Sequence, residues 1–240
     1  MNAGTPEITV ICPLDIERRA VERALRLRVA RSELEPVITV VCSGPGTDAV
    51  RSAVTRYAAA SSELVLAGLC GGLTPGEDAS QEIAEVIDSR GGHWRCAERG
   101  AVLIGVDEPV CSVEAKRALA ARTGAALVDM ESHGFAAACS EAGVPWRIIR
   151  EVSDGGGAAL PRQAASWVDE RGRMRGFRVL VDVLRRPWCL PALMRLGRDS
   201  KDALRRLGVR VVAAVEAAEE GRARLRDSTK ALPGSGVAHG

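Results

Sequence analysis

The stretch from Leu127 to Asp154 constrains the fold more than any other part of the sequence. It reads as a strand end with carboxylates, a short helix of small residues, a Gly-Val-Pro turn, and a β-branched strand ending at Ser153-Asp154. In an open α/β sheet, ligands bind beyond the carboxyl ends of the strands. Glu131 and Asp154 lie at the ends of two strands joined by one helix, so we expect both carboxylates in one ligand site.

The rest of the chain repeats this alternation of strands and helices. With 240 residues, 46% of them hydrophobic, the chain can bury one large core. We therefore predict a single α/β domain. The hydrophobic pattern predicts strands at 8–12, 37–42, 64–73, 82–88 and 101–106, a hairpin or excursion at 89–100, and helices after residue 15, at 48–60, at 113–123 and from 192 onward.

Composition excludes several classes of protein. A net charge of +2 does not indicate the strongly basic surface that is typical of nucleic-acid binding. Seven cysteines without a C-x-x-C pair argue against a zinc site or a disulfide framework and favour a reducing cytoplasm. No signal-peptide pattern opens the chain, and no apolar run approaches the roughly 20 residues of a membrane span. We expect a cytoplasmic protein that at most touches the surface of the inner membrane.

Acidic and glycine positions elsewhere suggest further contacts with a ligand. Glu17 opens the first helix, where a carboxylate is also favoured by the helix dipole alone. Gly44 and Gly46 precede a helix N-terminus, whose free N–H groups bind anions or hydroxyls, although a plain tight turn has the same sequence. Gly71 and Gly72 end a buried strand and let the backbone approach a ligand closely.

Three motifs in order carry a resemblance to a known family. V-D-M-E at 128–131, G-V-P at 143–145 and R-x-x-S-D at 150–154 resemble the signature of the purine nucleoside phosphorylase and methylthioadenosine/S-adenosylhomocysteine nucleosidase superfamily. The resemblance implies a three-layer αβα fold with a mixed central sheet, cleavage of an N-glycosidic bond, and a homodimer or larger homo-oligomer. The segment 185–196 is similar to the hopanoid-associated phosphorylase branch, which implies a lipid-linked purine nucleoside, adenosylhopane, as the source of adenine.

The resemblance also implies roles for individual residues. Asp154 would protonate N7 of the purine, Glu131 would accept hydrogen bonds from the ribose hydroxyls, and Met130 would form an apolar floor below the sugar. Glu17 would activate water, or phosphate held by Arg18 would replace it as co-substrate. No metal or other cofactor is expected. The remaining predicted contacts are Gly44, Gly46, Gly71, Gly72, Val110 and Ser153.

The sequence departs from the family pattern at three places. Ala79 and Ser80 stand where the family has Gly-Asp before the next strand. Leu69 stands where many members carry a serine that helps to hold phosphate or water. Pro109 and Val110 stand where relatives often place an aromatic residue against the base. Stacking against the base must then involve less contact area or come from another residue, such as Phe135 or Trp167.

Two charged or titratable residues near the motifs receive a structural interpretation. Arg150 is expected to form a salt bridge with Glu151 or Glu131 rather than contact a ligand. His133 lies on the helix after Glu131, and a single histidine on a helix is more often a satisfied structural residue.

The C-terminal third is predicted from pattern alone. We expect the domain to span 1–226, with a helical extension at 185–226 and a disordered tail at 227–240, and we expect 155–159 to be a flexible run suited to a gate. The extension could form an apolar channel, rest on a membrane, or dock on the core or another subunit. The residues concerned are Trp188, Leu190, Leu193 and Met194, between Arg185, Arg186 and Arg195.

Three functions stay open at this point. The first is phosphorolysis or hydrolysis of adenosylhopane, the second is hydrolysis of methylthioadenosine or another small 5′-substituted adenosine, and the third is a catalytically silent nucleoside-binding protein. A dinucleotide-binding Rossmann domain is disfavoured, because no G-x-G-x-x-G follows a strand.

Overall fold

The computed structural model describes residues 7–29, 38–74, 82–157, 167–175 and 190–230. In chain order the elements are β1 (Glu7–Cys12), α1 (Asp15–Val29), β2 (Ile38–Cys42), α2 (Thr47–Tyr57), the 3₁₀ turn η1 (Ala58–Ala60), β3 (Ser61–Gly72), β4 (Ile83–Asp88), β5 (His93–Arg95), β6 (Ala101–Gly105), α3 (Val113–Thr123), β7 (Leu127–Asp129), α4 (Ser132–Ala142), β8 (Trp146–Asp154) and α6 (Leu190–Lys230).

The described strands form one mixed sheet around the 12-residue strand β3. Strand β3 pairs in parallel with β1 on one side and β8 on the other, and antiparallel with β7 at Gly71 and Gly72. Strand β1 also pairs in parallel with β2. Strands β7, β6 and β4 continue in parallel, and β5 closes the predicted hairpin on β4. The predicted mixed sheet is confirmed.

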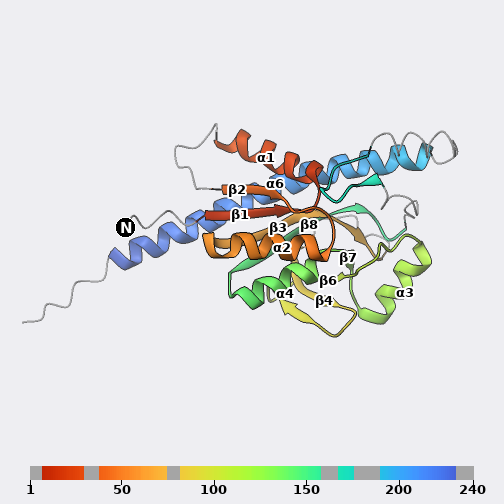
Figure 1. Cartoon of the computed structure of the whole chain (residues 1–240), viewed down its shortest axis with the longest axis horizontal. Helices are drawn as coiled ribbons and strands as arrows, with labels where there is room; N and C mark the ends of the chain where they lie inside the picture. The colour runs from red at the N-terminus through yellow and green to blue at the C-terminus, as the bar shows by residue number, and fades with distance from the viewer. Residues whose placement is uncertain (1–6, 30–37, 75–81, 158–166, 176–189, 231–240) are drawn as a thin grey trace, which may run out of the picture.

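Helices cover both faces of this sheet, which confirms the three-layer arrangement (Figure 1). Helices α1 and α6 pack side by side on one face, over a core that includes Val10, Val65 and Ile149. Helices α2 and α4 pack on the other face, over Ile11, Leu66 and other buried side chains. Because both faces are covered, the central strand β3 is a continuous apolar run rather than an alternating one.

Local sequence signals explain where the shorter helices begin and end. Ser112 caps α3 by accepting a hydrogen bond from the Ala115 amide at 3.1 Å, and Gly124 ends it with φ 70°. Gly143 ends α4 in the same left-handed conformation, with φ 65°. These caps hold α3 and α4 in register with the strands that follow them.

Helix α6 runs along the sheet and its last turns extend beyond it (Figure 1). The predicted apolar positions Ala203, Leu204, Leu207 and Val211 are buried against β1, β3 and β8. The helix also neutralises a buried charge, since Glu151 of β8 is fully buried and pairs with Arg206 and Arg210 at 2.9 Å and 3.1 Å. Docking on the core is thus confirmed for this part of the extension.

Several predictions for the C-terminal third fall at the limit of the described residues. Helix α6 continues to Lys230, so the first four residues of the predicted disordered tail are helical. Met194 is half exposed, whereas Trp188 and the side chains of Leu190 and Leu193 lie outside the described residues. The predicted domain limits stay a prediction.

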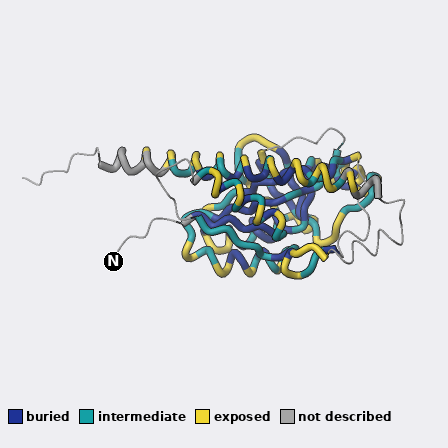
Figure 2. The backbone as a smooth tube through the Cα atoms, turned by 90° about the horizontal axis from the view of Figure 1, so that it is seen from above, coloured by how far each residue is buried: buried dark blue, intermediate teal, exposed yellow. Residues whose placement is uncertain are grey.

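Burial follows the layers, with the strands buried and the outer helix faces exposed (Figure 2). Among the described residues, no helix combines the length and apolar character that a membrane crossing requires.

Candidate active site

The predicted site residues gather where β3, β7 and β8 meet. Gly71 of β3 pairs with Val128 of β7 on one side and with Asp154 of β8 on the other. A Cβ atom on Gly71 would lie 3.2 Å from Val128 and 3.4 Å from the Asp154 carboxylate, so a larger residue would press on both. Glu131 follows β7 directly, so the two carboxylates of the 127–154 stretch flank one strand end.

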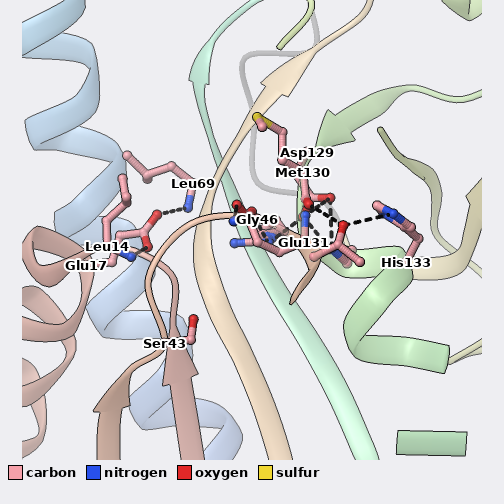
Figure 3. Close-up of polar contacts among 12 residues, drawn as sticks. Leu14, Glu17, Ser43, Gly46, Leu69, Asp129, Met130, Glu131 and His133 are labelled. Atoms are coloured by element: carbon pink, nitrogen blue, oxygen red, sulfur yellow. Dashed lines mark hydrogen bonds and ion pairs between the residues drawn. The ribbon is translucent and has the colours of Figure 1, made fainter. Parts of the chain in front are cut away.

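Glu17 lies in the first turn of α1, beyond the end of β1, and is 2% exposed. Its Oε2 accepts a hydrogen bond from the Leu14 amide at 2.8 Å, and its Oε1 accepts one from the Leu69 amide at 2.7 Å (Figure 3). Burial raises the pKa of Glu17 to about 7, although the charge of Arg150 and these two amides oppose that shift. The carboxyl can therefore gain or lose a proton near neutral pH.

Gly68 of β3 brings Glu17 and Arg150 together. A Cβ atom at this position would lie 2.2 Å from Nη1 of Arg150 and 2.8 Å from Oε1 of Glu17. No side chain larger than hydrogen fits there without moving one of the two groups. The glycine thus lets a carboxyl after β1 and a guanidinium on β8 meet over the middle strand.

Arg150 is fully buried and joins two further carboxylates. Its Nη2 lies 2.5 Å from Oδ2 of Asp129 and 3.2 Å from Oε2 of Glu131. Burial opposes its charge, but the charges of Asp129, Glu131 and Glu17 outweigh burial and raise the pKa of the guanidinium. The predicted structural pairing with Glu131 is confirmed, whereas the other predicted partner, Glu151, pairs with α6.

Asp129 was not predicted as a site residue, and it organises the turn that carries Glu131. Its Oδ1 accepts a hydrogen bond from the Ser132 amide at 3.1 Å, and its Oδ2 accepts one from the Ser132 hydroxyl. These contacts hold the first turn of α4. Asp129 is the last residue of β7, and its position in the V-D-M-E motif was the available signal.

Glu131 binds the glycine turn after β2. Its Oε1 accepts a hydrogen bond from the Gly46 amide at 3.0 Å (Figure 3). Burial raises the pKa of Glu131, with Arg150 opposing that shift. The free N–H that the turn was expected to present is therefore engaged by a carboxylate of the chain. Gly44 packs against the Glu170 carbonyl, which a Cβ atom would approach to 2.2 Å.

Asp154, the last residue of β8, is held by two side chains. Its Oδ2 lies 2.6 Å from the ammonium of Lys116, and its Oδ1 accepts a hydrogen bond from the Ser153 hydroxyl at 2.9 Å. Burial raises the pKa of Asp154, and Lys116 and Ser153 only partly offset this. Lys116 was not predicted, because α3 has no other feature of a ligand site.

Other predicted contacts occupy the rim of this region. The Met130 carbonyl accepts a hydrogen bond from the Thr47 hydroxyl at 3.3 Å, and the Met130 side chain is half-buried. Val110 packs against the apolar cluster that includes Leu119 below α3. Gly72 is buried in the β3–β7 pairing.

Phe135 is not available to stack on a base. It is fully buried between α4 and the sheet and meets Trp146 edge-on, with ring centroids 6.1 Å apart. Its side chain points from α4 into the core, so it cannot serve as the predicted stacking residue. Trp167, the other candidate, is also buried.

His133 is only partly satisfied. Its Nε2 lies 3.1 Å from the Thr47 hydroxyl, while its Nδ1 is buried with no hydrogen-bond partner among the described residues. It borders a cavity of about 740 Å³ whose wall also includes Gly46, Trp94 and Arg51. The prediction of a fully satisfied structural histidine is therefore wrong for one ring nitrogen.

The predicted gate begins with ordered residues. The Gly155 carbonyl accepts a hydrogen bond from the Lys116 ammonium at 3.1 Å. A Cβ atom on Gly156 would lie 2.5 Å from the Thr74 backbone. These two glycines are held in place, and residues 158 and 159 lie outside the described residues.

Comparison with known proteins agrees with the observed fold. Residues 77–185 match the model of the phosphorylase superfamily. No curated protein matches the sequence.

Solved structures with the same fold include one hydrolase and two proteins named as nucleosidases. Futalosine hydrolase of Helicobacter pylori superposes with a TM-score of 0.62 at 14% identity, covering 89% of this chain and 98% of that one. The 5′-methylthioadenosine/S-adenosylhomocysteine nucleosidase of the same organism gives 0.59 at 15% identity, covering 89% and 99%. A putative nucleosidase of that class from Francisella philomiragia gives 0.59 at 14% identity, covering 88% and 98%. At these identities the likeness establishes the fold.

Proposed function

We propose that this chain cleaves the N-glycosidic bond of a purine nucleoside by hydrolysis. The observation that carries the proposal is the buried Glu17 carboxyl, held by two backbone amides with a pKa of about 7. A group whose pKa lies near the working pH is suited to accept a proton from water as the reaction proceeds. Asp154 supplies the complementary group, an acid whose pKa is raised by burial.

The reaction assigns one task to each carboxyl. Asp154 gives its proton to N7 of the purine while the electron pair of the glycosidic bond moves onto the base. The sugar then carries positive charge at C1′, which the carboxylate of Glu131 stabilises while it accepts hydrogen bonds from the ribose hydroxyls. Water attacks C1′, and Glu17 takes its proton.

Charge in the site favours water over phosphate as the nucleophile. Glu17, Asp129 and Glu131 surround a single guanidinium, that of Arg150. A phosphate anion beside Glu17 would meet this excess of negative charge, whereas neutral water would not. The Leu69 amide, which could otherwise bind an anion, donates to Glu17.

Arg18 gives no support to the phosphorolytic alternative. Its guanidinium binds Asp15 at 2.7 Å and also pairs with Glu22, both on α1. A phosphate would have to compete with two carboxylates for it. We therefore rank phosphorolysis second.

The proposed substrate is an adenine nucleoside with a substituent at the 5′ position. The solved structures with this fold include nucleosidases named for 5′-methylthioadenosine and S-adenosylhomocysteine. Adenosylhopane, which the C-terminal resemblance implied, remains our proposal for the natural substrate, and 5′-methylthioadenosine is the small alternative. Residues 185–189, expected to border the lipid, lie outside the described residues.

We also propose a homo-oligomer, at least a dimer, that is cytoplasmic and touches the inner membrane when it meets a lipid-linked substrate. Light scattering tests the first expectation, and co-sedimentation with vesicles that contain adenosylhopane tests the second. A monomer, or equal recovery with and without vesicles, would remove the respective expectation.

Adenine release tests the reaction itself. The protein is incubated with adenosylhopane and with 5′-methylthioadenosine, each with and without phosphate, and both adenine and the sugar product are measured. The proposal requires adenine release without phosphate and a sugar with a free hydroxyl at C1′. A strict phosphate requirement with a 1-phosphate sugar establishes phosphorolysis instead, and binding without release corresponds to the silent alternative.

A further inference from the structure

Lys116 is a fully buried lysine on α3. The chain has three lysines among its 33 basic residues, Lys116, Lys201 and Lys230. The Lys116 side chain is 0% exposed, although it comes from α3, a helix on the edge of the molecule. An ammonium so far from water persists only when it is paired and hydrogen-bonded.

This ammonium contacts the last residue of β8 and the residue after it. Its Nζ lies 2.6 Å from Oδ2 of Asp154, 3.1 Å from the Gly155 carbonyl and 3.4 Å from the Asp154 carbonyl. One side chain thus binds the carboxyl and the backbone on both sides of it. This arrangement fixes the direction in which the Asp154 carboxyl points.

The two oxygens of Asp154 therefore have different surroundings. Oδ2 is held by Lys116, while Oδ1 accepts a hydrogen bond only from the Ser153 hydroxyl among the contacts described. That hydroxyl lies 3.3 Å from the Cys70 carbonyl as well. Its single hydrogen can turn to Cys70 when Oδ1 carries a proton, so Oδ1 is free to donate.

We propose that Lys116 is a positioning residue for base protonation: its ammonium fixes Asp154 through Oδ2 and leaves Oδ1 as the oxygen that gives its proton to the departing purine. In this step the Oδ1–H bond breaks, an N–H bond forms on the base, and Lys116 stays charged throughout. The inference rests on the proposed function, because it gives Lys116 a task only if Asp154 protonates a leaving base.

The charged surroundings of Asp154 make the role measurable. From α3, Lys116 favours its ionised form, and from β8, Ser153 does the same. On β3, burial raises the pKa of the Cys70 thiol, so that group stays neutral. Removal of the ammonium should therefore raise the pKa of Asp154 and extend activity toward higher pH, while the loss of alignment slows the reaction.

The test compares Lys116→Met with Lys116→Arg and with the wild type. The substrate is whichever of adenosylhopane, 5′-methylthioadenosine and adenosine the wild type cleaves fastest, and kcat, KM and their pH profiles are measured. We expect Lys116→Met to lower kcat about 100-fold with little change in KM, and to move the alkaline limb of the kcat profile upward. Lys116→Arg should return the alkaline limb to its wild-type pH, because arginine supplies a cation at the same position. Arg117→Met, an exposed neighbour on α3, is the matched control and should behave as the wild type.

The outcomes separate this inference from the proposed function. An active wild type together with a folded Lys116→Met variant of unchanged kcat and pH profile overturns the inference alone. A second result also overturns the inference. In it, Lys116→Met loses activity only in proportion to its loss of folded protein, and Lys116→Arg has the alkaline limb of the wild type but a kcat no higher than that of Lys116→Met. A folded wild type that releases base from none of the three nucleosides overturns the proposed function, and this inference with it.

Discussion

Glu17 and Leu69 lie 52 residues apart in the chain, and the Leu69 amide donates a hydrogen bond of 2.7 Å to the Glu17 carboxylate. The contact joins the first turn of α1 to the C-terminal third of β3. It uses the backbone of Leu69, so the absence of a serine side chain at this position does not interrupt it. A carboxyl held in this way is fixed in direction, and burial raises its pKa to about 7.

Replacement of Glu17 with glutamine should lower kcat by about 10²- to 10⁴-fold, which is the usual contribution of a general base. Adenine release from the best substrate is the measurement. Glu22→Gln, on the same helix but at its surface, is the matched control. Equal rates in Glu17→Gln and Glu22→Gln would remove Glu17 from the reaction.

Activity should rise with pH through about pH 7 on the acidic side of the profile. Glu17 must be ionised to accept a proton from water, and burial raises its pKa to about 7. The profile of kcat/KM for the wild type measures this limb. A limb near pH 4.5, the ordinary value for a glutamate, would show that burial does not control Glu17.

The same pKa predicts how stability changes with pH. Because the pKa of Glu17 is higher in the folded state than in the unfolded state, its favourable contribution is full below about pH 4.5 and is lost as pH rises through about 7. The Glu17→Gln variant should therefore gain stability relative to the wild type between pH 4 and 8, by up to about 3 kcal/mol. Urea unfolding at several pH values measures the difference. A difference that does not vary with pH argues against a raised pKa.

Loss of the buried guanidinium should destabilise the fold. Arg150→Met leaves Asp129 and Glu131 buried without their cation, which typically costs about 3–5 kcal/mol. Arg147→Met on the same strand breaks a more exposed pair with Glu63 and should cost at most about 1 kcal/mol. Urea unfolding measures the free energy of unfolding of both variants. Equal losses of stability would mean that the buried pairs of Arg150 contribute no more than the exposed pair of Arg147.

Removal of the negative charge at residue 131 should weaken substrate binding strongly. Glu131→Gln keeps the shape and one acceptor oxygen, but it loses a charged hydrogen-bond acceptor worth about 1.5–3 kcal/mol, which corresponds to roughly a 10- to 100-fold rise in KM. Glu141→Gln, exposed at the end of α4, serves as the control. Unchanged KM in the folded Glu131→Gln protein would place the ribose elsewhere.

Most of the fold was predictable because its signals are local. The runs predicted as strands at 8–12, 37–42, 64–73, 82–88 and 101–106 all overlap strands of the structure, and the predicted limits of α3 match its observed limits, where Ser112 and Gly124 cap the helix. The V-D-M-E and S-D motifs also indicated correctly that residues 131 and 154 lie at the ends of two strands of one sheet, β7 and β8, which both pair with β3. Such predictions need only the order of residues along the chain.

The partners of the carboxylates could not be predicted, because they come from distant segments. Lys116 reaches Asp154 from a helix 38 residues earlier in the chain. Arg206 and Arg210 reach Glu151 from α6. Phe135 was one of two candidates for base stacking but lies in the core, since a helical pattern does not state which neighbour covers each face. Tertiary packing decides these contacts.

The most direct test of the central claim is adenine release by the wild type and by Asp154→Asn in buffer without phosphate, with folding checked by thermal unfolding. Asp107→Asn, an exposed aspartate, is the control. We predict steady release of adenine and free sugar by the wild type and the control, and a loss of about 10²- to 10⁴-fold in Asp154→Asn. Release by folded Asp154→Asn at the wild-type rate would contradict the account.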